Sequence, residues 1–278
     1  MSKNTNTDID INSEKVVEVL DDMPLWSAPF GQLLLENIQY RKNISVLDIG
    51  FGLGFPLTEL AMRLGNSSTV YGIDPWGEGI ERTKRKIEVY EINNVEILKG
   101  RAEEVPLEDE SIDLITSNNG INNVEDLDKV LLECSRMLKK DGQFVQTVNL
   151  DTSLIEFYEI MEHVLVQEKM LEEVKRMKEH IYHKRKPLNV FLKMLEENNF
   201  KIEKVEHREF DYRFVDGTSL LEHFFIRLAF LQSWMEIVTE DKQEFIFDKI
   251  ESELNKKAQK EGFLKLTIPF VMIDCRKS

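Results

Sequence analysis

Short apolar runs alternate with amphipathic segments through the first half of the chain. Runs with the length and composition of buried strands occur at Ile44–Ile49, Thr69–Ile73, Val95–Lys99, Ile112–Ser117 and Gln143–Asn149. Segments with helical periodicity stand between them, at Pro56–Leu64, Gly79–Tyr90 and Leu127–Leu138. This alternation predicts an α/β fold with a doubly wound, mostly parallel sheet.

The second half follows a different pattern. Residues 153–178 place apolar side chains at helical spacing and predict one long amphipathic helix. A helix at Leu188–Asn198 follows, then a strand at Phe200–Phe214, and a last strand at Leu264–Cys275. These two strands bring the predicted sheet to seven, and a helical segment at 218–260 separates them.

The apolar content of the second half predicts how the chain is organised. Residues 221–235 hold more aromatic and aliphatic side chains than one face of a surface helix can hide. We therefore expect helical insertions at about 151–187 and 216–262 to form a lid over a ligand-binding core at about 40–150. Residues 13–278 are expected to be one domain that begins with two short helices at 13–38, after a disordered tail at 1–12.

Charge and composition exclude several classes of partner. The formal net charge is -15, which argues against nucleic acid, because a nucleic-acid binder presents a basic face. No apolar stretch approaches the ~18 residues of a membrane span, and the N-terminus lacks the apolar segment of a signal peptide. Cys134 and Cys275 lie far apart without metal-ligand spacing, so we expect no metal site. These features predict a cytoplasmic protein without an integral membrane segment.

The strongest candidate for ligand chemistry follows the first strand. Gly50, Gly52 and Gly54 stand at alternate positions, and glycines let a backbone turn sharply and approach a ligand closely. The next helix then presents its N-terminus to that ligand. This spacing differs from the G-x-G-x-x-G fingerprint of dinucleotide sites. Asp48 adds a carboxylate that would repel a pyrophosphate but suits an ammonium group, directly or through water.

A second carboxylate, Asp74, ends the second strand. An acid at this position can accept hydrogen bonds from both hydroxyls of a ribose. Alone, Asp74 could serve as a helix N-cap. Together with the glycine turn, it favours a ligand that contains adenosine.

These residues resemble the class I S-adenosylmethionine-dependent methyltransferases, and in particular those of ubiquinone and menaquinone biosynthesis that methylate carbon. Residues 100–107 are similar to the family's segment beside the adenine, 111–115 to its fourth-strand motif, and 138–143 to its turn before the fifth strand. The resemblance covers residues 44–150. It implies S-adenosyl-L-methionine as methyl donor and S-adenosyl-L-homocysteine as product. The glycine loop would hold the methionine part, and Asp74 the ribose.

Arg101 departs from the family pattern. The family often has an acid there that accepts from the adenine amino group, and an arginine cannot accept. The resemblance therefore assigns adenine recognition to the backbone around Ala102 and to Glu103. Pro75 and Trp76 could supply an apolar face to the base, although ordinary surface packing explains Trp76 equally well.

Two further positions concern the reaction. Asn118 begins a stretch, 118–124, at the carboxyl edge of the sheet and joins the donor-binding candidates. That stretch is similar to the F-G-x-R-N-V segment of the quinone methyltransferases and lacks the N-P-P-Y motif of enzymes that methylate bases or glutamine. A general base is needed only if the acceptor arrives protonated. His223, on the aromatic segment, is then the best candidate.

The resemblance implies an enzyme with a small-molecule acceptor, apolar or aromatic in character. A methyltransferase acting on a quinone precursor is the first alternative. A regulator that binds S-adenosylmethionine without catalysis is another, of a different class. The glycine spacing disfavours a nicotinamide-dependent dehydrogenase. The sequence also allows a homodimer, because the aromatic segment could instead pack against a second subunit.

Overall fold

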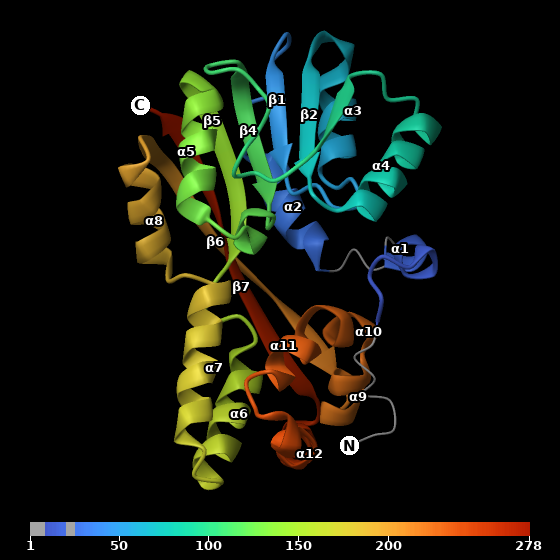
Figure 1. Cartoon of the computed structure of the whole chain (residues 1–278), viewed down its shortest axis with the longest axis vertical. Helices are drawn as coiled ribbons and strands as arrows, with labels where there is room; N and C mark the ends of the chain where they lie inside the picture. Colours follow the sequence, from blue (N-terminus) through green and yellow to red (C-terminus); the bar gives the residue numbers. More distant parts are fainter. Residues whose placement is uncertain (1–8, 21–25) are drawn as a thin grey trace. The chain divides into compact units, whose positions relative to one another are not determined.

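The computed structural model describes residues 9–20 and 26–278, and its main feature is one seven-stranded sheet (Figure 1). The strands are β1 Ser45–Ile49, β2 Thr69–Asp74, β3 Val95–Lys99, β4 Ile112–Asn118, β5 Leu138–Asn149, β6 Phe200–Phe214 and β7 Leu264–Lys277. Their order is β3-β2-β1-β4-β5-β7-β6, with β1 to β5 parallel and β7 antiparallel to β5. The predicted doubly wound, mostly parallel sheet is confirmed.

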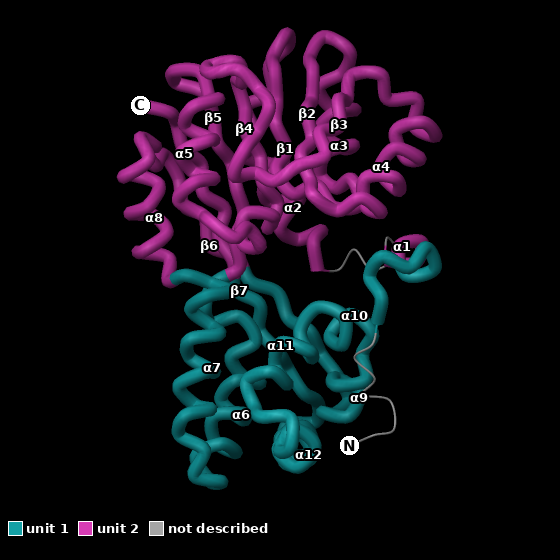
Figure 2. Tube along the Cα trace, in the orientation of Figure 1, with its two compact units in different colours: residues 1–16, 150–186, 209–269 teal, residues 17–149, 187–208, 270–278 magenta. Residues whose placement is uncertain are grey.

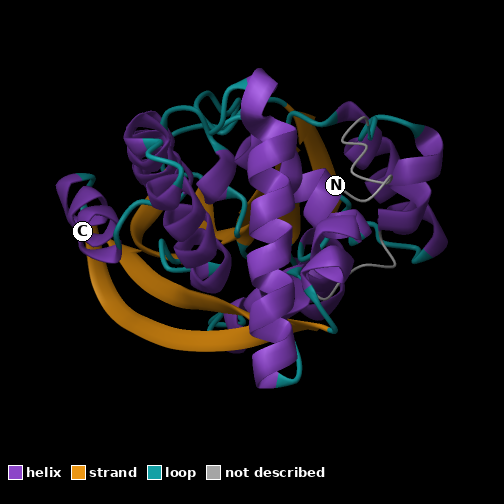
Figure 3. Ribbon diagram, turned by 90° about the horizontal axis from the view of Figure 1, so that it is seen from below, coloured by secondary structure: helices purple, strands orange, loops and turns teal. Residues whose placement is uncertain are grey.

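Helices occupy most of the remaining described chain, as the colours of Figure 3 show. In the first half they are α1 Glu14–Leu20, α2 Ser27–Glu36, α3 Leu57–Leu64, α4 Gly77–Val89 and α5 Leu127–Met137. In the second half they are α6 Ile155–Gln167, α7 Leu171–Lys184, α8 Leu188–Glu197, α9 Gly217–Glu222, α10 Phe224–Ile226, α11 Gln232–Met235 and α12 Glu240–Glu261. A π-helical turn, Arg227–Leu231, joins α10 to α11.

The chain forms two compact units (Figure 2). Unit 2 comprises residues 17–149, 187–208 and 270–278 and contains β1 to β5. Unit 1 comprises residues 1–16, 150–186 and 209–269, and it contains α6, α7 and α9 to α12. The helical insertions expected from the sequence therefore belong almost entirely to unit 1, whereas the predicted core belongs to unit 2.

Burial explains the central strands of unit 2. β1 lies between β2 and β4, and Val46, Leu47 and Ile49 are fully or almost fully buried. Strands covered on both faces are continuous apolar runs, as observed here. Helix α5 has a recognisable start, because the Asp126 side chain accepts from the Lys129 N–H at 3.1 Å and caps the helix.

The core of unit 1 is aromatic. The rings of Phe157 and Trp234 stack with centroids 3.8 Å apart, and the Trp234 Nε1–H donates to the Tyr158 hydroxyl at 3.0 Å. The π-helical turn lets Phe225 and Phe230, five positions apart, meet edge to face at 5.8 Å. Among the described residues, no helix combines the length and apolar character that crossing a bilayer requires.

Two predicted boundaries were wrong. The single helix expected at 153–178 is two helices, α6 and α7, because Lys169 between them adopts the left-handed region at φ 60°. No glycine or proline marks this break in the sequence. Strand β5 starts at Leu138 rather than Gln143, because Leu138 already pairs with Ile112 ahead of a register shift. Most of the tail predicted at 1–12 lies outside the described residues.

Candidate functional site

The glycine loop after β1 has a backbone that other residues adopt with strain. Gly50, Gly52 and Gly54 have φ angles of 74°, 52° and 98°, all in the left-handed region. A Cβ on Gly50 would also lie 2.9 Å from the Cα of Gly120, so the loops after β1 and β4 approach too closely for a side chain. The alternating glycines are therefore required by the conformation and by this close approach.

This loop forms one wall of a pocket of about 490 Å³ in unit 2. Ile49 and Ile73 at the carboxyl ends of β1 and β2 contribute to it. The pocket brings together the predicted residues Gly50, Gly52, Asp74, Pro75, Arg101, Ala102 and Glu103. Its lining does not include the predicted residues Asp48, Gly54, Trp76 and Asn118. The sequence analysis did not assign four further lining residues to the donor: Gly120, Asn123, Val124 and Glu125.

Asp74 links the glycine loop to the next helix. Its Oδ2 accepts from the Gly52 N–H at 2.8 Å, and its Oδ1 accepts from the Trp76 N–H at 2.8 Å. Each carboxylate oxygen retains capacity for a further hydrogen bond. The carboxylate can therefore hold the loop and still accept from a ligand hydroxyl in the pocket.

Asp48 has a different environment. Its side chain is fully buried; Oδ1 accepts from the Thr116 hydroxyl at 2.7 Å, while Oδ2 has no hydrogen-bond partner among the described residues. Burial raises the pKa of Asp48 to about 7; the Thr116 hydrogen bond lowers it and the charge of Asp74 raises it. The carboxyl group therefore lies beneath the loop, and its role toward an ammonium group stays a prediction.

Arg101 and Glu103 pair at the rim of the pocket. The Arg101 Nη2 lies 2.6 Å from the Glu125 Oε1, and its Nε lies 3.7 Å from the Glu103 Oε2. The Glu103 Oε1 accepts from the N–H groups of Glu125 and Asp126 at 3.0 and 3.2 Å. Burial acts to raise the pKa of Glu103, but these backbone hydrogen bonds and Arg101 hold it below its usual range. Glu103 therefore fixes the start of α5, and the backbone of Ala102 remains as a pocket group.

Two residues of α4 hold the glycine loop, and sequence analysis missed both. The Thr83 hydroxyl lies 3.3 Å from the Gly52 carbonyl oxygen and 2.9 Å from that of Gly79. The Lys86 Nζ donates to the Leu53 carbonyl at 2.7 Å. Both residues look like ordinary helix residues in the sequence, so no local signal identifies them.

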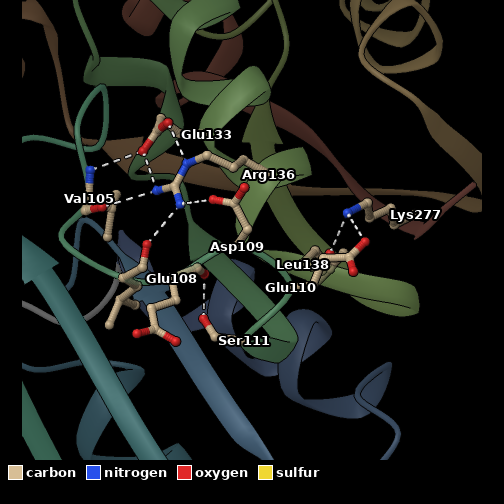
Figure 4. A network of polar contacts seen from close by, with 10 residues as sticks. Val105, Glu108, Asp109, Glu110, Ser111, Glu133, Arg136, Leu138 and Lys277 are labelled. Carbon is tan, nitrogen blue, oxygen red and sulfur yellow. Dashed lines mark hydrogen bonds and ion pairs between the residues drawn. The ribbon is translucent and has the colours of Figure 1, made fainter.

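Arg136 of α5 holds residues 105–109, the segment that follows Ala102 and Glu103 in the chain (Figure 4). Its Nη1 donates to the Leu107 carbonyl at 2.8 Å and contacts the Asp109 Oδ1 at 2.7 Å. Its Nη2 donates to the Val105 carbonyl at 3.1 Å. The guanidinium also pairs with Glu133 and thereby lowers the pKa of that carboxyl. One side chain thus fixes the segment that directly follows the pocket residues 101–103.

Asn118 and Trp76 have structural contacts of their own. The Asn118 Nδ2 donates to the Ser27 carbonyl at 3.2 Å, and its Oδ1 accepts from the Thr147 hydroxyl at 3.0 Å. The Trp76 ring covers Gly79, where an added Cβ would lie 2.5 Å from Trp76 Cε3. Both side chains therefore support the site from outside the pocket lining.

His223 belongs to unit 1, between α9 and α10. Its ring meets Phe214 edge to face at 5.4 Å, and its Nδ1 is buried without a partner in the described part of the chain. Burial lowers the pKa of His223, so the ring is neutral at pH 7.

Comparisons with known proteins agree with this geometry. A family model described as a methyltransferase domain matches residues 40–208. The demethylmenaquinone methyltransferase of Bacillus mycoides is 32% identical over 117 residues, 42% of this chain and 49% of that protein. The ubiquinone/menaquinone biosynthesis C-methyltransferase of Geotalea daltonii is 34% identical over 112 residues, which are 40% of this chain and 48% of that protein. The chain therefore spans about half the length of these curated relatives.

Solved structures share the fold. A putative methyltransferase from Bacillus halodurans superposes with a TM-score of 0.62 at 21% identity, over 89% of this chain and 98% of that one. An S-adenosylmethionine-dependent methyltransferase from Aquifex aeolicus superposes with a TM-score of 0.53 at 20% identity, over 69% of this chain and 91% of that one.

The sheet order and the matched family define the class as Rossmann-like methyltransferases that use S-adenosylmethionine. Within that class, the chain belongs to the methyltransferase domain family. The resemblance inferred from the glycine turn and the following motifs is confirmed.

Proposed function

We propose that this protein transfers a methyl group from S-adenosylmethionine to a small apolar or aromatic molecule. The observation that carries the proposal is the pocket that joins the left-handed glycine loop to Asp74. A carboxylate there suits ribose hydroxyls, and the glycines leave room for the methionine part. Methyl transfer is a displacement at a sulfonium carbon, so alignment and exclusion of water supply most of the catalysis.

A quinone precursor is the specific acceptor that the relatives favour. Two of them are named for methylation in menaquinone or ubiquinone biosynthesis, and they match this chain over 42% and 40% of its length. The aromatic segment 221–235 in unit 1 is consistent with an apolar acceptor. A regulator that binds S-adenosylmethionine without turnover is the alternative of another class.

Transfer of a labelled methyl group tests the proposal. The protein is incubated with methyl-labelled S-adenosylmethionine and a panel containing demethylmenaquinone, simple phenols and a peptide. We expect label in an apolar or aromatic member, and less of it when Asp74 is replaced by Ala and the donor is kept below saturation. Label in the peptide alone would contradict the acceptor class. Tight binding of S-adenosylhomocysteine with no transfer to any acceptor would favour the regulator.

We further propose His223 as the general base for an acceptor that arrives protonated. The neutral ring has the unpartnered Nδ1 that accepting a proton requires. His223→Gln should lower kcat by about 10²–10⁴-fold and leave the affinity for S-adenosylhomocysteine unchanged. His163→Gln, which replaces an exposed histidine of α6, is the matched control. An unchanged kcat in His223→Gln would remove the assignment.

A further inference from the structure

One arginine of unit 1 is buried without a counter-ion. Arg185 follows α7 and is only 6% exposed. Its side chain makes no hydrogen bond or ion pair with any residue of the described chain, and its Nη1 is fully enclosed. One nitrogen of this guanidinium is therefore enclosed in unit 1 without an acceptor from the described residues.

An enclosed guanidinium nitrogen without an acceptor is unfavourable unless an anion reaches it. Proteins normally offset the burial of a charged group with a partner. The flanking cations avoid it, because Lys184 is exposed and Lys186 lies over the Tyr182 ring at 5.2 Å. Arg185 is thus the exception within this basic turn, and a ligand is the simplest missing partner.

His180 of α7 senses the charge of Arg185: burial, together with Lys184 and Arg185, lowers the pKa of His180 to about 4, while the carboxylate of Glu236 acts in the opposite direction. Glu236 forms no ion pair or hydrogen bond with Arg185. His180 is therefore neutral at pH 7 and cannot serve as a counter-ion. Its ring lies 6.4 Å from that of Tyr158, whose oxygen already accepts from Trp234. The Tyr158 hydroxyl hydrogen has no acceptor among the described residues.

We propose that Arg185 binds a carboxylate or phosphate group of a small molecule. A planar guanidinium suits both anions, because it presents paired N–H groups to two oxygens. This site belongs to unit 1 alone and does not depend on the proposed function. Its ligand is a small molecule that carries an acid group.

The overall charge of the chain makes this site selective. At a formal net charge of -15, the protein as a whole repels small anions, so non-specific binding is disfavoured. Saturable binding of an anion therefore requires a specific binding site with a local positive charge.

Titration with two anions tests the proposal. Benzoate and inorganic phosphate are added separately to the wild-type protein, to Arg185→Met and to Lys184→Met, with calorimetry and thermal unfolding as readouts. Lys184→Met is the matched control, because it removes the same charge from the adjacent exposed position. We expect saturable binding to the wild type and to Lys184→Met, and binding at least about tenfold weaker to Arg185→Met. Benzoate binding would indicate a carboxylate site, and phosphate binding a phosphate site.

The ligand-free proteins give a second readout. Replacing an unpaired buried charge with an apolar side chain should leave Tm equal to or above that of the wild type. If Arg185→Met does not fold, Arg185→Lys takes its place, because it keeps the charge but loses the planar pair of donors. Arg185→Lys should then bind the anion more weakly than the wild type does.

Two results would overturn the proposal: no saturable binding of either anion to the wild type, or equal weakening in the Arg185 and Lys184 variants. The donor is measured separately with S-adenosylhomocysteine, and all these variants should bind it as the wild type does. Absence of anion binding to the wild type with donor binding intact refutes this site alone, whereas absence of donor binding to the wild type refutes the proposed function.

Discussion

Two carboxyl groups serve the glycine loop at the residue scale, and their environments give them different properties. Asp74 accepts two backbone hydrogen bonds and faces the pocket. Asp48 is fully buried, with one oxygen bonded to Thr116, and its pKa is raised to about 7. Asp48 therefore changes its charge near neutral pH.

The raised pKa of Asp48 predicts a pH-dependent stability. The folded protein keeps the Asp48 proton up to about pH 7, whereas the unfolded chain loses it near 3.8. Between those values the folded state binds more protons, so the contribution of Asp48 to the unfolding free energy falls as pH rises. The upper bound of this loss is roughly 4 kcal/mol, at 1.36 kcal/mol per pKa unit. Above pH 7 the loss is complete and constant.

Urea unfolding of the wild type and Asp48→Asn at pH 5, 6, 7 and 8 measures this effect. As pH rises, the unfolding free energy of Asp48→Asn should increase relative to that of the wild type. The wild type loses stability when Asp48 ionises, whereas Asn cannot ionise. Comparing the two proteins cancels the titration of other groups, such as His180, whose lowered pKa acts in the opposite direction. A difference that stays constant over this range would contradict the account.

Among the elements, the glycine loop allows the cost of backbone strain to be measured apart from the loss of ligand binding. Gly52 has no atom within 4 Å of an added Cβ, but its φ is 52°. Gly52→Ala should therefore cost the free protein only about 1–2 kcal/mol, from the left-handed backbone. The new methyl group occupies open space at the pocket wall, so affinity for S-adenosylhomocysteine should fall at least about tenfold.

Gly54→Ala is the comparison variant. An added Cβ there would lie 3.1 Å from Thr83, and Gly54 does not line the pocket. We expect Gly54→Ala to lose more stability than Gly52→Ala. Relative to that loss of stability, its affinity for S-adenosylhomocysteine should fall less than that of Gly52→Ala. Thermal unfolding and calorimetry on both variants measure this contrast. Unchanged donor affinity in Gly52→Ala would show that the loop does not face the donor.

The elements also show what could be predicted from the sequence and what could not. Continuous apolar runs and the glycine spacing predicted the sheet and the loop, because both depend on local pattern. The break between α6 and α7 was missed, since Lys169 adopts a left-handed backbone without glycine or proline. Thr83 and Arg136 were missed because their roles arise from contacts across the fold, 31 and 29 residues away in sequence. Local pattern has no access to such contacts.

At the scale of the whole molecule, the helical segments of unit 1 are predicted to respond to the donor. Their aromatic side chains, and the need to exclude water from the sulfonium, support the lid expected from the sequence. Hydrogen exchange with and without S-adenosylhomocysteine measures this, and size exclusion monitors the mass. Residues 218–238 should gain protection at constant mass, while α8 serves as the control segment. Protection that instead follows protein concentration would indicate a subunit interface and contradict the lid.

The central claim is that the pocket beside the glycine loop binds S-adenosylmethionine, and calorimetry tests it most directly. The protein is titrated with S-adenosylhomocysteine and with NADH. Asp74→Ala is measured alongside Asp216→Ala, which removes the aspartate that caps α9 outside the pocket. The account predicts that S-adenosylhomocysteine binds more tightly than NADH. It also predicts that Asp74→Ala weakens binding by about 1.5–3 kcal/mol, the contribution of a charge-assisted hydrogen bond, while Asp216→Ala does not. Tighter binding of NADH, or equal donor affinity in wild type and Asp74→Ala, would contradict it.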